Sequence, residues 1–319
     1  KPTPEQLEAQ RRMQDSIALV EQAKLLEQQQ AFEKAAKAEQ EFASLPDSVR
    51  VAKLQNSFGV FADAMVGEDG TTVLENELIE VRLKNKGGRV GYVRLKEYDN
   101  YKGEPLVLFN EEDSKFDLKL VTAANRVINT EDLYFTPIKG ADSNSVTMRL
   151  NTGDGSYLDF VYTLNPNEYM LQFSIKGTGL NGVLSPSTTA LDLDWEQKII
   201  QQEKGRKFED RYATVYYKLM ADDVEYLSET QDDNKQLSSR LKWIAYKDMF
   251  FSSILIADGE GFESTVIDSK MLPKDSPFLK AYKTTTSIPF DLKGNEATDM
   301  RFYFGPNQFS LLKSFDDHV

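Results

Sequence analysis

Three carboxylates follow one another at alternate positions in the segment Leu191-Asp192-Leu193-Asp194-Trp195-Glu196. Alternate side chains of a β-strand point to the same face, so Asp192, Asp194 and Glu196 share one face and the apolar residues share the other. Such a row is suited to holding a hard cation such as calcium, or to binding a sugar. The same pattern is more often the wet face of an outer strand, and we favour that interpretation.

Few other motifs in the sequence could support catalysis or ligand binding. The only histidine is the penultimate residue, His318, and the chain has no cysteine. The residues therefore give no basis for a Ser-His-Asp triad or for zinc sites of the usual kind. Residues 177–182 have the glycine spacing of a dinucleotide fingerprint, but Val183-Leu184-Ser185-Pro186 follows where a helix should open. We predict a non-enzymatic protein with no catalytic residue, metal or cofactor.

The charge composition of the chain argues against nucleic acid and anionic membranes as partners. The 319 residues include 38 Lys and Arg against 51 Asp and Glu, a net charge of -13 that would repel nucleic acid and an anionic membrane leaflet. No run of about 18 apolar residues is present, so this stretch is not expected to span a bilayer. The opening Lys1-Pro2-Thr3-Pro4 does not read as a signal peptide, and we expect the sequence to be a piece of a longer protein.

The elements that position these residues begin with a polar stalk. Residues 4–45 are rich in Gln, Glu, Ala and Lys, and Thr3 is suited to cap a helix whose first residue is Pro4. The apolar stripe is too thin for a regular coiled coil. We expect residues 1–46 to be a helical or partly disordered stalk, or a helix that pairs with another element.

Residues 47–304 read as a β domain. Asn76 to Lys84 alternates polar and apolar residues, and Gly87-Gly88 provides a tight turn before Arg89 to Leu95. The densest apolar run, Trp243 to Ile256, is apolar on both faces and predicts one interior strand with a bulge at Lys247-Asp248. Further strands are expected at residues 145–150, 157–164, 169–176, 192–200, 211–219, 263–268 and 300–304.

Few helical patterns separate these strands, so two large antiparallel sheets packed face to face are the expected fold. Residues 305–319 form the third predicted part, a short C-terminal helical linker toward a membrane part.

Three segments together resemble the large periplasmic domain of the YidC membrane protein insertases: residues 76–108, 243–256 and 302–315. The resemblance covers most of residues 70–319. It implies a β-supersandwich similar to galactose mutarotases, tethered by flanking membrane helices at the periplasmic face of the inner membrane. It also implies a role in inserting and folding inner-membrane proteins beside the Sec translocon. The implied partners are nascent membrane proteins and Sec subunits, SecF among them.

The resemblance carries over no catalytic residue, but it directs attention to the C-terminal linker. Phe309, Leu311, Leu312 and Phe315 are candidate interaction residues there, although we favour packing of this helix on its own sandwich. The alternative function is a carbohydrate- or peptide-binding sandwich that uses the Asp192 to Glu196 face. Mutarotase catalysis requires an acid and a base, usually glutamate and histidine, and a lone His318 disfavours it.

Overall fold

A computed structural model describes the chain at residues 4–221 and 224–308. The chain divides into two compact units, residues 1–57 and 58–319, and each is described by itself. In the residues described, no helix has both the length and the apolar composition that a bilayer crossing requires.

The first unit is helical. Helix α1 (Pro4–Ala43) is built from Gln, Glu, Ala and Lys, which have high helix propensity, and confirms the predicted N-terminal helix. Its apolar side chains Leu19, Leu25 and Phe32 are exposed. Helix α2 (Asp47–Phe58) follows at once, where the sequence analysis expected β-rich runs. The missed signal is the helical spacing of Val51, Leu54 and Phe58 within a segment that lacks strand alternation.

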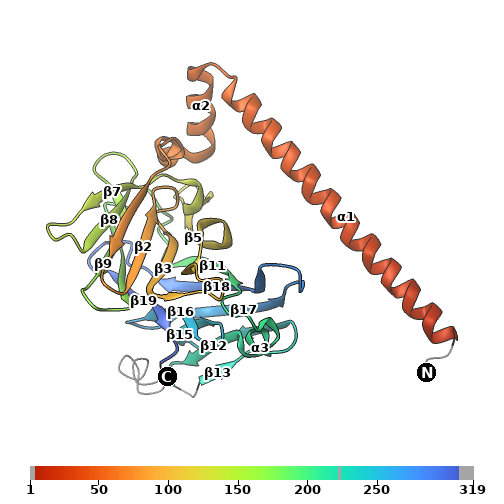
Figure 1. Ribbon diagram of the computed structural model, residues 1–319. Coiled ribbons are helices and arrows are strands. Elements are labelled where there is room, and N and C mark those ends of the chain that lie inside the picture. Colours follow the sequence, from red (N-terminus) through yellow and green to blue (C-terminus); the bar gives the residue numbers. More distant parts are fainter. Residues whose placement is uncertain (1–3, 222–223, 309–319) are drawn as a thin grey trace. The chain divides into compact units, whose positions relative to one another are not determined.

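The second unit opens with the 3-10 helix η1 (Gly59–Met65) and then forms three antiparallel sheets (Figure 1). The four-stranded sheet has the order β1 (Thr71–Glu75), β2 (Ile79–Lys84), β3 (Val90–Asp99), β4 (Pro105–Phe109). The six-stranded sheet has the order β14 (Asp233–Leu237), β17 (Glu263–Met271), β18 (Phe278–Pro289), β11 (Ala190–Ile200), β5 (Ser114–Val121), β6 (Val127–Asn129). The nine-stranded sheet has the order β13 (Val224–Tyr226), β12 (Thr214–Leu219), β15 (Leu241–Lys247), β16 (Phe251–Ala257), β19 (Thr298–Pro306), β10 (Met170–Thr178), β9 (Tyr157–Leu164), β8 (Ser145–Asn151), β7 (Thr136–Lys139).

Three further short helices lie in the described part of this unit: η2 (Glu111–Asp113), η3 (Thr130–Asp132) and α3 (Arg206–Tyr212). Helix α3 leads directly into β12.

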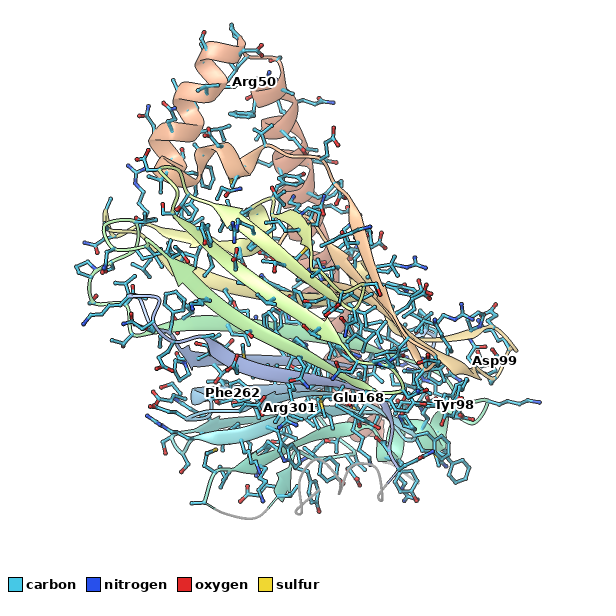
Figure 2. The ribbon with its side chains drawn as sticks, turned by 90° about the vertical axis from the view of Figure 1, so that its left-hand side faces the viewer. Arg50, Tyr98, Asp99, Glu168, Phe262 and Arg301 are labelled. Atoms are coloured by element: carbon cyan, nitrogen blue, oxygen red, sulfur yellow. The ribbon has the colours of Figure 1, made fainter. Side chains whose placement is uncertain are left out.

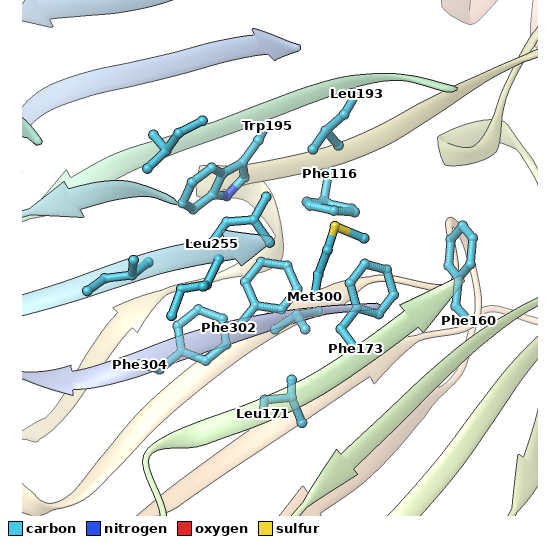
Figure 3. Packing of buried hydrophobic residues seen from close by; sticks show 14 of the residues in the cluster. Phe116, Phe160, Leu171, Phe173, Leu193, Trp195, Leu255, Met300, Phe302 and Phe304 are labelled. Atoms are coloured by element: carbon cyan, nitrogen blue, oxygen red, sulfur yellow. The ribbon is translucent and has the colours of Figure 1, made fainter. Parts of the chain in front are cut away.

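An aromatic core joins the six- and nine-stranded sheets (Figure 3). The ring of Phe116 on β5 lies 5.5 Å from that of Phe302 on β19 and 5.7 Å from that of Phe173 on β10. Trp195 on β11 stacks on Tyr246 of β15 with ring centroids 3.8 Å apart. Such aromatic pairs stabilise beyond the area that they bury. The antiparallel β-sandwich is therefore confirmed, with a four-stranded sheet in addition to the two large sheets that were predicted. The predicted C-terminal helix lies outside the described residues.

The hairpins read from the sequence are present. Ile79, Val81 and Leu83 alternate inward on β2 and are fully buried. Gly87 and Gly88 have φ of 85° and 61°, the left-handed conformation that a tight turn into β3 requires.

The run Trp243 to Ile256 is two strands and not one. β15 and β16 pair antiparallel, with Trp243 opposite Ile256, and both are interior to the nine-stranded sheet. The Lys247-Asp248 interruption, predicted as a bulge, opens the turn between them, where the buried Asp248 carboxylate accepts hydrogen bonds from the N–H groups of Phe250 and Phe251. Phe251 is buried, whereas Phe250 is 46% exposed.

The strand predicted at residues 211–219 also begins late. Arg211 and Tyr212 end helix α3, and β12 starts at Thr214.

Candidate interaction surfaces

The three predicted carboxylates lie on β11, an interior strand of the six-stranded sheet and not an outer one. Leu191, Leu193 and Trp195 are buried in the core, and the acidic side chains take the opposite face. Of the three, Asp192 is exposed, Asp194 is buried and Glu196 is intermediate.

Each of these carboxylates has a partner on a neighbouring strand. Ser287 Oγ donates to Asp192 Oδ1 at 2.6 Å. Thr285 Oγ1 donates to Asp194 Oδ1 at 2.7 Å, and the Lys119 Nζ lies 3.0 Å from Asp194 Oδ2. Glu196 Oε1 lies 2.9 Å from the Nζ of Lys283.

These contacts decide what the face does. Burial opposes ionisation of Asp194, but the Thr285 hydrogen bond and the Lys119 ammonium outweigh it and lower its pKa. The carboxylates are thus held by cross-strand contacts of the kind that stabilise sheets. Within residues 4–221 and 224–308 no group of three or more His, Cys, Asp or Glu side chains is arranged to hold a metal ion.

A hollow of about 610 Å³ opens where β16 and β18 end and β19 begins. Its apolar wall includes Phe262, Ile288, Phe290 and Met300. Figure 2 labels Phe262 and Arg301 over the lower strands, and Tyr98 and Asp99 at the right of the view, where β3 ends. The acidic members of the lining are Glu260, Asp291, Glu296 and Asp299.

Two of those acids, Glu260 and Asp291, are engaged by neighbouring residues. Glu260 Oε2 lies 3.0 Å from the guanidinium of Arg240, and the Asp291 carboxylate accepts the N–H groups of Lys293, Asn295 and Glu296. These bonds engage Glu260 and Asp291, two of the four acids that line the hollow.

The C-terminal candidates Phe309, Leu311, Leu312 and Phe315 lie outside the described residues, as does His318. Just before them, Asn307 N donates to Phe250 O at 2.6 Å and Ser252 Oγ donates to Asn307 Oδ1 at 2.6 Å. The described chain therefore ends against the β15–β16 turn.

Sequence reasoning missed three buried ionisable groups. Glu209 of α3 accepts the N–H groups of Gln202 at 2.8 Å and Glu203 at 3.1 Å, and burial raises its pKa to about 7. Burial also raises the pKa of Asp248 to about 7 against the pull of its two N–H donors.

Lys280 is the third group. It is fully buried and its ammonium donates to the carbonyl oxygens of Ala213 and Glu229, so burial lowers its pKa to about 8. The role of Lys280 has no local sequence signature, because its acceptors are 67 and 51 residues away along the chain. Asp248 and Glu209 instead bond N–H groups within seven residues, and what the sequence did not reveal is their burial.

The fold and surfaces define an antiparallel β-sandwich domain that follows a helical segment and whose predicted carboxylate row is internally paired. The family model for the YidC periplasmic domain matches residues 71–319. The chain therefore belongs to the YidC periplasmic domain family, as the sequence resemblance predicted.

A membrane protein insertase YidC of Parabacteroides distasonis is 65% identical over 319 residues, which is 100% of this chain and 50% of the relative. One from Bacteroides fragilis is 41% identical over 316 residues, 99% of this chain and 49% of the relative. The chain thus spans about half the length of the curated relatives it matches.

Among solved structures, the periplasmic domain of Thermotoga maritima YidC has a TM-score of 0.39 at 13% identity, over 79% of this chain and 92% of that one. A galactose mutarotase-like protein from Lactobacillus casei has a TM-score of 0.45 at 8% identity, over 74% of this chain and 100% of that one.

Proposed function

We propose that this chain is the non-enzymatic periplasmic interaction module of a membrane protein insertase. The observation that carries the proposal is the family match over residues 71–319, together with relatives named as insertases that align with the whole chain. In this role the domain is held at the periplasmic face of the inner membrane by other parts of the protein. It assists nascent membrane proteins through surface contacts and not through bond chemistry.

The proposed partners are the nascent membrane proteins themselves and subunits of the Sec translocon, with SecF the first to examine. The proposed division of labour keeps residues 1–46 as a stalk, 47–304 as the part that begins with helix α2 and contains the sandwich, and 305–319 as a linker toward the membrane part. Phe309, Leu311, Leu312 and Phe315 are the linker positions at which to look for contact with another subunit.

Crosslinking in membranes tests the proposal. A photoreactive residue is placed in the full-length protein at exposed apolar positions of the sandwich, such as Val127, Ile138 and Phe250. We expect adducts with Sec subunits or nascent chains after illumination. Light-dependent adducts with neither would remove the proposed partners.

The carbohydrate-binding alternative is tested separately with a glycan array, and mutarotase activity with a mutarotation assay. We expect neither turnover nor glycan binding, since the carboxylates of β11 are engaged by Ser287, Thr285, Lys119 and Lys283. Clear turnover or binding would replace the scaffold function with a carbohydrate-directed one.

A further inference from the structure

Helix α3 and the segment that leads into it have an inverted distribution of side chains. Across residues 203–212 the exposed positions are Lys204, Gly205, Lys207, Phe208, Arg211 and Tyr212. Phe208 is 63% exposed and Tyr212 is 43% exposed, whereas the carboxylate of the same helix, Glu209, is fully buried. A surface helix of a soluble domain ordinarily buries its apolar residues and exposes its charges.

Two acidic side chains of this segment, Glu209 and Asp210, are held by specific bonds, and the third, Glu203, is half-buried. Glu209 accepts the N–H groups of Gln202 and Glu203, and Asp210 lies 3.5 Å from the guanidinium of Arg206 in a half-buried pair. Arg206 itself donates to the carbonyl oxygens of Pro273 and Phe278. The exposed charged side chains in residues 203–212 are Lys204, Lys207 and Arg211, all of them cations, in a chain whose net charge is -13.

Helical spacing gathers the exposed residues into one face. Lys207 and Arg211 are four residues apart, as are Phe208 and Tyr212, and side chains at this spacing are neighbours on a helix surface. We call Lys204, Lys207, Phe208, Arg211 and Tyr212 the α3 face.

The adjoining β3–β4 loop adds a further aromatic residue and a cation. Tyr101 N donates to Gln202 O at 2.8 Å, which holds the loop against the segment before α3. Tyr101 and Lys102 are both exposed, and the Lys102 ammonium lies 5.6 Å from the Tyr101 ring centroid. The exposed acids beside these residues are Asp99, which ends β3, and Glu104, whose carboxylate accepts a hydrogen bond from the side-chain amide of Asn100.

We propose that the α3 face binds an anionic lipid surface. Interleaved Phe or Tyr and Lys or Arg side chains suit the headgroup region, where the rings enter the acyl boundary and the cations meet lipid phosphates. The overall charge of -13 does not prevent this, because at physiological salt charges beyond about 8 Å are largely screened and the near face dominates. The inference rests on the proposed insertase role only for placing a membrane beside the domain.

A vesicle sedimentation assay with the 319-residue chain tests the proposal directly. The vesicles contain phosphatidylcholine alone or mixed with phosphatidylglycerol. We expect binding to the mixed vesicles that weakens as salt is raised, and little binding to phosphatidylcholine alone. Since each cation near an anionic surface contributes several-fold to partitioning, Lys207→Glu with Phe208→Ser should lower the partition coefficient by at least about tenfold.

The control carries the same kind of change on another exposed apolar and cationic pair, Ile138→Ser with Lys139→Glu on β7. β7 is at the opposite edge of the nine-stranded sheet from β13 and β12, and helix α3 leads directly into β12. The control should bind within about twofold of the unaltered chain, because only charges within roughly a Debye length of the lipid contribute.

Three results would overturn the lipid assignment. They are no binding of the unaltered chain to mixed vesicles at low salt, equal losses in both double variants, and equal binding to the two kinds of vesicle. A photoreactive residue at position 208 of the full-length protein that labels a protein and not lipid would assign the face to a protein partner instead. Each result leaves the crosslinking test of the insertase partners unaffected, so the two proposals fail separately.

Discussion

The Asp248→Asn substitution isolates the effect of burying a carboxylate in the β15–β16 turn. Asp248 is buried, and its Oδ1 accepts the N–H groups of Phe250 at 2.7 Å and Phe251 at 2.6 Å. Asparagine offers an amide oxygen to the same two donors and removes the ionisation. We therefore expect the turn to be retained while the electrostatic penalty disappears.

The size and sign of the effect follow from the pKa. Burial raises the pKa of Asp248 from 3.8 to about 7, so between these values the folded chain holds a proton that the unfolded chain releases. The unaltered protein consequently loses stability as pH rises from about 4 to 7, by at most about 4 kcal/mol. The advantage of the asparagine variant should be small at pH 4 and reach roughly 2 to 4 kcal/mol at pH 8.

Urea unfolding followed by tryptophan fluorescence measures this difference, since Trp195 and Trp243 are both buried. Asp248→Ala is the control: it removes both the charge and the acceptor, so it should be less stable than the asparagine variant at each pH. Parallel stability curves for the unaltered and asparagine chains between pH 4 and 8 would refute the reasoning.

The other predictions concern the remaining buried groups and the carboxylate face. Glu209→Gln should change stability in the same direction as Asp248→Asn, because burial raises the pKa of Glu209 to about 7. Its stability should gain on that of the unaltered chain as pH rises from about 4.5 through 7, and no gain in urea midpoint at pH 8 would contradict this. Burial lowers the pKa of Lys280 to about 8, so between pH 8 and 10 the unfolded chain binds a proton that the folded chain has released, and the free energy of unfolding should rise with pH. Lys280→Met should flatten that rise, and an unchanged slope would show that the ammonium is not desolvated. Phe251→Ala should lower the free energy of unfolding by about 3 to 5 kcal/mol and Phe250→Ala by less than about 1, with equal losses inconsistent with their different burial. Millimolar calcium should leave the thermal midpoint unchanged, whereas an upward shift would restore the cation interpretation of Asp192, Asp194 and Glu196.

Local alternation was enough to predict much of the fold. The two faces of β2 and β11 and the Gly87-Gly88 turn are determined by period-two patterns and by a positive φ, which neighbouring residues alone reveal. One long apolar run was mistaken for a single strand because apolarity does not show where a chain reverses. The carboxylate of Asp248 lies at that reversal. It accepts the N–H groups of Phe250 and Phe251, which point toward it only once the turn has formed.

The candidate surfaces were harder to predict for a related reason. Cross-strand partners such as Lys119 and Thr285 are far from Asp194 in sequence, so the pairing that engages it was not readable. The last two residues of α3, Arg211 and Tyr212, were assigned to a strand and the rest of the helix was not predicted. The helix is only seven residues long and places Phe208 outward and Glu209 inward, opposite to the usual pattern.

Site-specific crosslinking from the sandwich of the full-length protein in membranes tests the central claim most directly. With the photoreactive residue at Val127, Ile138 or Phe250 in turn, the interaction module predicts light-dependent adducts with Sec subunits or nascent membrane proteins. Adducts with neither from any of these positions, in membranes where the protein still inserts its clients, would contradict it.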